Sequence, residues 1–303
     1  SDLDTYFVDN LIGEDDIPTI PSALTKVDMT DAQKVQIRSL SPLFTNNSNE
    51  IELVFGNDVV IADNSKNESY YCDYDFDTDT EIYCDRLIYN EGVFEGLKLK
   101  LTNLDKVKYI GWYAFKDATL DNTSQSIAIS SNQTIGGHVF ENTNITSLDL
   151  NTEEIGEAIC KDCSSLSTLT LGNNVKKLYG SVFQNTPNLN LEFDSKNIES
   201  IGGFAFEGSG VSKVSLRSAL TLIDEMAFAN TNLGTVDFSE STPRLGILAF
   251  YNSNLSSVDL GNGVTTISDY AFHRCESLTD ITIPNGVTII GDYAFANCYS
   301  LTD

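Results

Sequence analysis

Ten positions along this chain carry an aromatic residue or its equivalent at a regular spacing. From Phe183 onward the interval is always 22 or 23 residues. The positions are Phe94, Phe115, Phe140, Cys160, Phe183, Phe206, Phe228, Phe250, Phe272 and Phe295. Self-similarity at this period predicts stacked coils whose hydrophobic interiors join into one column. Function is therefore expected on a surface rather than in an enclosed pocket.

Two further columns repeat around the aromatic positions. From Phe115 onward, an Ile or Leu lies five residues before each one, as Ile223 does before Phe228. Three residues after it comes a small side chain, and this small-residue column consists of Thr143, Cys163, Thr186, Ser209, Thr231, Ser253, Cys275 and Cys298. We expect both columns to be buried, and large residues to be excluded from the second.

Each coil also contains a segment in which apolar residues alternate. Val236 and Phe238 show the period of two that a β-strand requires. Because every coil runs in the same direction, these strands are expected to pair in parallel, about 4.8 Å apart. Asn-Gly turns such as Asn262-Gly263 close them.

Stacked coils need covered ends, because one coil buries too little apolar surface to offset the entropy of ordering it. We expect residues 1–86 to form a small N-terminal α/β capping domain, with a short amphipathic helix over residues 30–40. Residues 87–303 are expected to hold about nine to ten coils. The last coil is incomplete at Asp303, which predicts either a truncated chain or a longer parent array.

Three C-terminal segments carry a family resemblance. They read ISDYAF at residues 267–272, CESLTDITIP at residues 275–284 and IGDYAFANC at residues 290–298. These segments look like the BspA-like leucine-rich repeats of bacterial and protist surface proteins. The resemblance implies a right-handed α/β solenoid with short parallel strands on its concave face. It also implies a secreted or surface-attached protein, and members of the family are implicated in adhesion to host matrix proteins.

Two departures from the repeat predict local irregularity. Cys160 stands where the other coils have an aromatic residue, and Phe115 and Phe140 are 25 residues apart. We expect the irregular backbone near residues 116–134.

The charge balance restricts the partners. The chain has 44 Asp and Glu residues against 18 Lys and Arg residues, a net charge of −26. Nucleic acid and anionic membranes are not expected partners, since both attract Lys and Arg. No apolar run approaches the about 20 residues of a membrane span, so membrane insertion of this segment is not expected. With the resemblance, this favours an extracellular or cell-surface location, no cofactor, and a protein or glycan ligand such as host extracellular matrix.

Two cysteines stand outside the repeats. Cys72 and Cys84 lie symmetrically about Thr78, and a hairpin turning there would place them opposite each other. We predict a disulfide between them in an oxidising compartment, with free thiols as the alternative. Cys160 and Cys163 have the spacing of a metal or redox pair, but both occupy repeat columns and no second pair lies at a suitable spacing.

The stretch between these cysteines alternates acids with other residues. Its carboxylates are Asp73, Asp75, Asp77, Asp79 and Glu81, as in a calcium-binding loop. The loop pattern fails because Thr78 stands where Gly is needed and Cys84 where a bidentate Glu belongs. A solvated acidic face is the first interpretation, and a weak Ca²⁺ site is the second.

Catalytic chemistry is not expected. His138 and His273 are the only histidines, and they lie in coils too far apart to share a site. The sequence has no Gly-rich phosphate loop of the required spacing and no nucleophile elbow. A solenoid sheet also offers no enclosing cleft in which a carboxyl group could be desolvated.

The outward positions of the strands form the candidate binding surface. One column is Ser147, Thr168, Asn190, Lys213, Thr235, Ser257 and Asp280, and the other is Asp149, Thr170, Glu192, Ser215, Asp237, Asp259 and Thr282. The predicted binding residues are Lys213, Ser215, Thr235, Asp237, Ser257, Asp259, Asp280 and Thr282. A basic or hydroxyl-rich partner fits this polar, acidic face, and an ordinary solvated sheet is the alternative. The function is therefore either adhesion and recognition or an architectural repeat without a specific external ligand.

Overall fold

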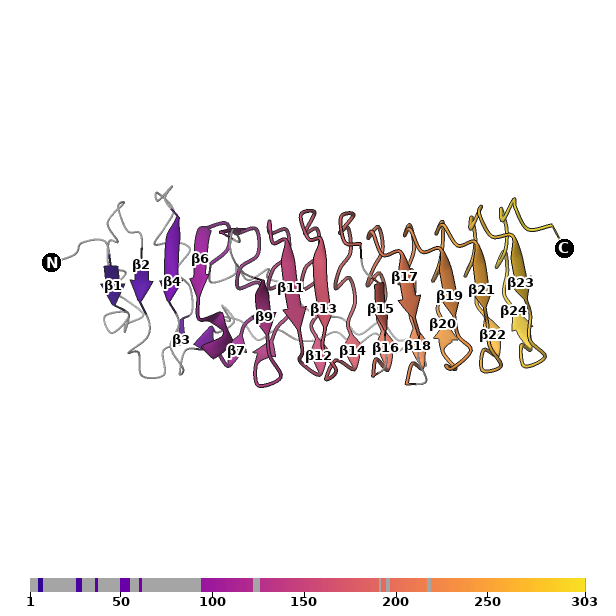
Figure 1. The fold of residues 1–303 in the computed structure, drawn as a ribbon, viewed down its shortest axis with the longest axis horizontal. Coiled ribbons are helices and arrows are strands. Elements are labelled where there is room, and N and C mark those ends of the chain that lie inside the picture. The colour runs from indigo at the N-terminus through magenta and orange to yellow at the C-terminus, as the bar shows by residue number, and fades with distance from the viewer. Residues whose placement is uncertain are drawn as a thin grey trace, which may run out of the picture.

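The computed structural model describes ten segments of the chain. They are residues 5–7, 26–28, 36–37, 50–54, 60–61, 94–121, 126–190, 192–194, 197–216 and 219–302. In these segments the backbone forms a stack of coils elongated along one axis (Figure 1). The coils contribute strands to two rows that run along the stack, so the molecule is a β-solenoid.

The first strand row contains most of the longer strands. It consists of β1 (Thr5–Phe7), β2 (Lys26–Asp28), β4 (Ile51–Val54), β6 (Lys98–Thr102) and β8 (Thr119–Leu120), then β9 (Ile127–Ile129), β11 (Ser147–Leu150) and β13 (Thr168–Leu171), then β15 (Glu192–Asp194), β17 (Lys213–Ser215), β19 (Thr235–Asp237), β21 (Ser257–Asp259) and β23 (Asp280–Thr282). Every pairing in it is parallel, as the repeat predicts.

The second strand row consists of two-residue strands, which the sequence analysis did not predict. They are β3 (Gln36–Ile37), β5 (Val60–Ile61), β7 (Tyr109–Ile110) and β10 (Thr134–Ile135), then β12 (Glu154–Ile155), β14 (Lys177–Leu178), β16 (Ser200–Ile201), β18 (Leu222–Ile223) and β20 (Arg244–Leu245), then β22 (Thr266–Ile267) and β24 (Ile289–Ile290). These pairs are also parallel. From β7 onward, each carries the Ile or Leu that lies five residues before the aromatic position.

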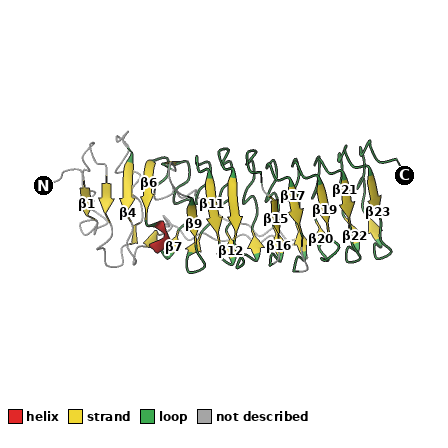
Figure 2. Ribbon diagram, viewed as in Figure 1, coloured by secondary structure: helices red, strands yellow, loops and turns green. Residues whose placement is uncertain are grey.

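Helix is nearly absent. In the described part of the chain, the only helical element is the 3₁₀-helix η3 (Leu104–Lys106) (Figure 2). The coils return through turns in which residues on both sides of the aromatic position have positive φ, such as Met226 and Asn230 around Phe228. Left-handed backbone interrupts an α-helix, so the expected α/β solenoid is instead built of strands and turns. The helix expected over residues 30–40 is wrong where β3 (Gln36–Ile37) lies.

Parallel pairing crosses the expected boundary at residue 86. Strand β4 pairs with β6, placing Ile51 beside Leu99, and β5 pairs with β7, placing Val60 beside Tyr109. Described strands of the N-terminal segment thus lie in the same two rows as the repeats. The division into residues 1–86 and 87–303, the capping role of the first part, the right-handed winding and the concave face stay predictions.

The aromatic positions form a stacked column in the core. Phe206, Phe228, Phe250 and Phe272 are fully buried, and their neighbouring ring centroids lie 5.3, 5.5 and 5.3 Å apart. A second stack includes Phe115 and Phe140 at 5.7 Å. Cys160, also fully buried, interrupts the column between the two stacks. These contacts confirm the predicted continuous core.

The small-residue column bonds one coil to the next. Thr231 Oγ1 and Ser253 Oγ both donate to the carbonyl oxygen of Phe228, over 2.9 and 2.6 Å. Cys275 Sγ and Cys298 Sγ donate to the carbonyl oxygens of Phe250 and Phe272, each one coil away, over 3.1 Å. In these coils a short side chain with a donor lies beside the aromatic stack and still reaches a carbonyl group.

The 25-residue interval contains the irregularity that the sequence predicts near residues 116–134. Here β8 pairs with β6, whereas β9 pairs with β11, so the first row changes sheets within one coil. The side chain of Asn144 takes the place of a neighbouring strand for Leu120. Its Oδ1 accepts from the Leu120 N–H over 2.6 Å, and its Nδ2 donates to the Leu120 carbonyl oxygen over 3.0 Å.

Candidate functional site

The predicted binding residues lie together on the outer side of the first row. Lys213, Thr235, Ser257 and Asp280 form one column, and Ser215, Asp237, Asp259 and Thr282 form the second. Ser215 is half-buried and the other seven are exposed. We call these eight residues the strand face. The structure brings them together as expected, and their role in binding stays a prediction.

The predicted columns are out of register at β15. The structure pairs Glu192 with Lys213 and Asp194 with Ser215. Asn190 was expected beside Lys213, and Glu192 was expected beside Ser215. Both expected positions lie two residues before the residue that the structure pairs there. The cause is a longer loop between the aromatic position and the strand in this coil than in the coils with which it was aligned.

Two carboxylates of the strand face accept hydrogen bonds from the turns that follow them. Asp237 Oδ1 accepts from the Ser239 N–H over 2.7 Å, and Asp259 Oδ1 accepts from the Gly261 N–H over 2.8 Å. The two residues are paired across β19 and β21, so their like charges lie in neighbouring positions. Such a pair is destabilising unless water or a cation compensates it. The strand face is thus a regular array of polar side chains in which carboxylates lie close together.

Six predicted site residues lie outside the described residues. They are the disulfide candidates Cys72 and Cys84 and the weak calcium candidates Asp73, Asp75, Asp77 and Asp79. Both interpretations stay predictions.

The cysteines of the repeat columns are core residues. Cys160, Cys163 and Cys275 are fully buried free thiols, and Cys163 Sγ donates to the carbonyl oxygen of Phe140 over 2.9 Å. Burial raises the pKa of Cys160 well above its ordinary value and that of Cys275 to about 12. Because the thiolate is the nucleophile and the metal ligand, these thiols are chemically inert in the native state. Among the residues described, no three His, Cys, Asp or Glu side chains are grouped to hold a metal ion.

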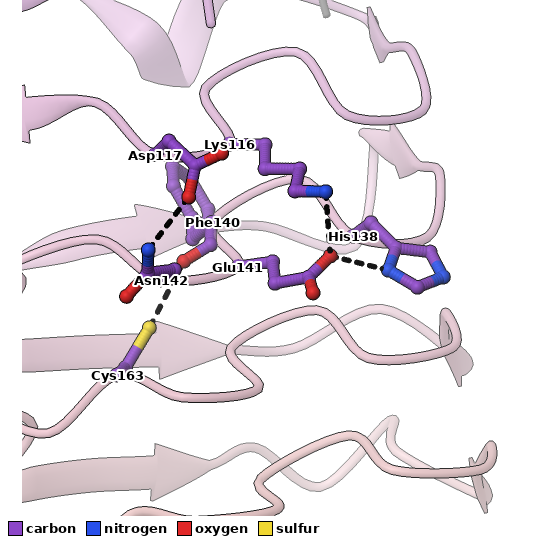
Figure 3. A network of polar contacts seen from close by, with 7 residues as sticks. All are labelled: Lys116, Asp117, His138, Phe140, Glu141, Asn142 and Cys163. Atoms are coloured by element: carbon purple, nitrogen blue, oxygen red, sulfur yellow. Dashed lines mark hydrogen bonds and ion pairs between the residues drawn. The ribbon is translucent and has the colours of Figure 1, made fainter. Parts of the chain in front are cut away.

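His138 belongs to a network that links neighbouring coils (Figure 3). Its Nδ1 lies 2.6 Å from Glu141 Oε2, which also lies 3.8 Å from Lys116 Nζ. Burial alone would raise the pKa of Glu141, but the hydrogen bond and charge of His138, with the charges of Lys116 and Lys161, lower it overall. The ring of His138 stacks on Tyr113 at 4.6 Å. This supports the prediction of a packing histidine.

His273 lies in a separate environment, several coils away. Its ring stacks on Tyr270 at 5.4 Å, and its Nε2 lies 3.0 Å from Asn297 Nδ2. The two histidines therefore do not share a site.

A groove beside the second row was not predicted from the sequence. It is a depression of about 920 Å³ running across the coils of β7, β10, β12, β14, β16 and β18. Its lining includes Gly136, Gly137, Gly156, Gly180, Gly202 and Gly203, with Trp112 and Tyr179 among them. We call this depression the glycine groove. An adjoining hollow of about 520 Å³ shares Ser131 and Glu153 with it.

The glycines allow Trp112 to lie against the backbone. A Cβ atom at Gly136 would stand 2.8 Å from Trp112 Cδ1, and one at Gly137 would stand 2.5 Å from Trp112 Cζ3. Both distances are closer than real Cβ contacts, so any side chain at these positions would displace the indole. Trp112 is half-buried, and its ring lies 6.0 Å from that of His138.

Paired charges border the groove. Lys177 Nζ lies 2.8 Å from Glu154 Oε1, and Lys176 Nζ lies 2.7 Å from Glu153 Oε1. The hydrogen bond from Lys177 is the main reason why the pKa of Glu154 lies below its ordinary value. Tyr179, which also lines the groove, donates from Oη to Glu154 Oε2 over 3.1 Å.

One signal in the sequence could have located the groove. Ile135-Gly136-Gly137 and Ile201-Gly202-Gly203 place paired glycines directly after the Ile of the second row. In later coils the equivalent positions hold side chains, as in Ile223-Asp224-Glu225. Glycine at two successive repeat positions, in some coils and not in others, indicates an open surface there rather than a requirement of the repeat.

Comparison with known families identifies the repeat. The sequence matches the family described as BspA type leucine rich repeat region, in six copies over residues 88–209 and 189–302. The chain belongs to this family. No catalytic family is indicated, and no curated protein matches the sequence. The resemblance drawn from residues 267–298 is confirmed.

A solved structure of a leucine-rich repeat protein shares the fold. A leucine-rich repeat protein from Bacteroides ovatus is 19% identical, with a TM-score of 0.64 over 92% of this chain and 66% of that one. The chain thus spans about two thirds of that protein's length. A leucine-rich cell surface protein from Faecalibacterium prausnitzii is 19% identical, with a TM-score of 0.34 over 73% of this chain and 78% of that one. At these identities the likeness concerns the fold alone.

Within the described residues, no helix has the length and apolar character needed to cross a membrane.

Proposed function

We propose that this chain is a non-enzymatic cell-surface or secreted leucine-rich-repeat protein that recognises a protein or glycan ligand and mediates adhesion. The observation that carries the proposal is the strand face. Its eight polar side chains stand in two registered columns on an open, rigid parallel sheet. Such a surface is ordered before binding, so a partner does not have to bear the cost of ordering it.

The chemistry of the strand face favours a basic partner. Asp237, Asp259 and Asp280 contribute three exposed carboxylates, and Lys213 lies at one end. The net charge of −26 adds a long-range attraction for cations. A basic segment of a host extracellular-matrix protein would relieve the repulsion between neighbouring carboxylates. Binding of this kind is sensitive to salt, because exposed charges are screened by ions.

One observation favours the second candidate function, an architectural repeat without a specific external ligand. Asp237 and Asp259 each accept a hydrogen bond from a turn N–H of their own coil. Their presence is thus explained in part by the stability of the turns.

A variant that removes carboxylate charges but keeps the hydrogen bonds to the turns distinguishes the two candidate functions. The double variant Asp237→Asn with Asp259→Asn keeps an oxygen acceptor for each turn and removes two charges. We expect it to weaken binding to immobilised fibronectin, laminin or collagen by about tenfold at low salt, and by less at high salt. The measurement is surface plasmon resonance with the full chain.

A matched control removes two charges elsewhere. Asp269→Asn with Asp292→Asn changes the net charge equally and retains an acceptor at Asp269, whose Oδ1 bonds the Asp292 N–H over 2.8 Å. Adhesion through the strand face requires this control to bind as the unmodified chain does. Equal binding by both double variants, or no matrix binding by any of them, would favour the architectural role.

We also propose that residues 1–86 cap the first coil of an array of about nine to ten coils in residues 87–303. A Cys72–Cys84 disulfide would stabilise such a cap by restricting its unfolded state. Peptide mapping without reduction tests this pairing, and separate alkylation of both thiols would refute it.

A further inference from the structure

The glycine groove is separate from the strand face and has a different composition. It follows the second strand row, whereas the strand face belongs to the first. From the coil of Tyr109 to that of Leu222 it crosses six coils, on the order of 20–25 Å at the spacing of parallel strands. We propose that the glycine groove is a binding site for a neutral glycan chain. This inference does not rest on the strand-face function.

Aromatic rings in the groove suit the apolar faces of sugar rings. Trp112 lies against the backbone of Gly136 and Gly137, which fixes the plane of the indole. Tyr179 is 44% exposed, and its hydroxyl group is held by Glu154. A positioned aromatic ring offers a large contact area at a small entropic cost. Because a pyranose ring presents C–H groups on its faces and hydroxyl groups on its rim, it can lie on such a ring while its rim meets polar groups.

Groups that can meet sugar hydroxyls surround these rings. Thr134 and Ser200 supply hydroxyl groups from β10 and β16. The ion pairs Glu153–Lys176 and Glu154–Lys177 present acceptors and donors side by side with no net charge. The adjoining hollow adds the amide-bearing residues Asn173, Asn174 and Asn197. This mixture of donors and acceptors resembles the rim of a sugar, which carries both on each hydroxyl group.

An anionic ligand does not fit the groove. Glu157 and Asp224 line it in addition to the paired carboxylates, and the whole chain carries a charge of −26. Sulfated or uronic-acid glycans and phosphate groups would be repelled. The glycan is therefore neutral.

An extended peptide is less favoured than a glycan, because much of the backbone along the groove is already paired. Backbone groups along its floor are already bonded between coils. The Gly136 N–H donates to Ile110 over 2.8 Å, the Gly202 N–H donates to Leu178 over 2.8 Å, and the Gly180 carbonyl oxygen accepts from Ala158 over 2.8 Å. A peptide that added a strand at these positions would find their backbone groups already paired.

Fluorescence of Trp112 provides a direct test, since it is the only tryptophan in the chain. The full chain is titrated with mannan, dextran, galactomannan and soluble β-glucan, and with heparin and polylysine for comparison. We expect at least one neutral polysaccharide to change the Trp112 emission saturably and to the same extent at low and high salt.

A side chain added to the floor of the groove tests the location. A Cβ atom at Gly180 would meet its nearest neighbour, the Gly203 carbonyl oxygen, at 3.4 Å, so the backbone can accept Gly180→Leu. The matched control is Gly234→Leu, where a Cβ atom has no neighbour within 4 Å and lies outside the groove. We expect Gly180→Leu to weaken the glycan by at least about tenfold and the control to leave it unchanged.

Removal of one ring tests the stacking. Tyr179→Ala is expected to weaken the glycan by about three- to tenfold. Tyr299→Ala is the control, because Tyr299 is 74% exposed and its hydroxyl group also has one side-chain partner, Asn297. Unchanged emission with every neutral polysaccharide would overturn the proposal. So would saturable binding of heparin or polylysine in their place, or equal affinity of the Gly180→Leu and Gly234→Leu variants.

Discussion

The coils from Phe206 to Phe272 and the longer coil between Phe115 and Phe140 satisfy their buried polar groups in different ways. In the former, equivalent residues of successive coils bond one another, as when Thr231 and Ser253 share the carbonyl oxygen of Phe228. In the longer coil, individual residues bond groups that the repeat leaves unpaired. The regular region is thus stabilised by repetition and the irregular one by particular side chains.

Gln133 is the clearest example of such a side chain, because its buried amide forms several hydrogen bonds. It is 5% exposed, and its Nε2 donates to the carbonyl oxygens of Leu104 and Val107 over 2.9 and 2.8 Å. Its Oε1 accepts from the backbone N–H and the hydroxyl group of Ser130 over 2.9 and 3.0 Å. The Nε2 bonds connect η3 to the coil of β10, and the Oε1 bonds hold the amide within that coil. A lengthened coil is tolerated where a buried amide of this kind replaces the lost backbone pairs.

The largest effect is expected in the regular region. Phe228→Ala should lower the free energy of unfolding by about 3–5 kcal/mol, because the ring is fully buried and stacks on both Phe206 and Phe250. Urea denaturation measures the loss. Cys160→Ala, at the break in the column, should cost only about 1 kcal/mol. Similar losses in both variants would mean that the aromatic stack is not the main support of the regular coils.

Gln133→Leu should have the next largest effect. It leaves the buried carbonyl groups of Leu104 and Val107 without donors, at an expected cost of about 2–4 kcal/mol. Asn132→Ala, an exposed amide beside it, is the control and should change stability by less than about 0.5 kcal/mol. The measurement is again urea denaturation. Equal stability of the two variants would contradict the fastening role of Gln133.

Asn144→Ala tests the completion of β8. The variant removes both hydrogen bonds to the Leu120 backbone, and because Asn144 is exposed we expect a loss of about 1–2 kcal/mol. Asn254 holds the same repeat position in a regular coil, and its side-chain amide donates to Asn232 Oδ1 over 3.4 Å. Asn254→Ala should therefore cost less than about 0.5 kcal/mol. Hydrogen exchange at Leu120, faster in the first variant alone, gives a local readout.

The smallest effect is expected within the small-residue column. The buried Ser209 Oγ has no hydrogen-bond partner in the described structure, so Ser209→Ala should change stability by less than about 0.5 kcal/mol or raise it slightly. Thr231→Val removes a bonded hydroxyl group at the equivalent position and should cost about 1 kcal/mol. Thermal unfolding of both variants measures the difference, and the reverse order would show that the column is selected for size alone.

Some features of the fold were predicted from the sequence and others were not. The buried spine through Phe228 and Phe250, the parallel strands and the irregular segment after Phe115 were all predicted. The pairing of β15 was not, because the length of a loop does not say where its extra residues are accommodated. The two-residue strands and the glycine groove were also missed, because only a fold that sets successive coils side by side makes them into a row and a surface.

The period of the apolar residues by itself determined that this chain stacks into coils, because no single coil can bury its own hydrophobic side. Only the tertiary structure decided which residues at equivalent repeat positions form different hydrogen bonds. Asn144 and Asn254 occupy the same place in the repeat, yet only Asn144 completes a strand, because only there does the neighbouring coil leave a backbone pair unmatched. The repeat specifies which positions hold buried side chains. The distance to the next coil decides which hydrogen-bond partner each polar side chain can reach.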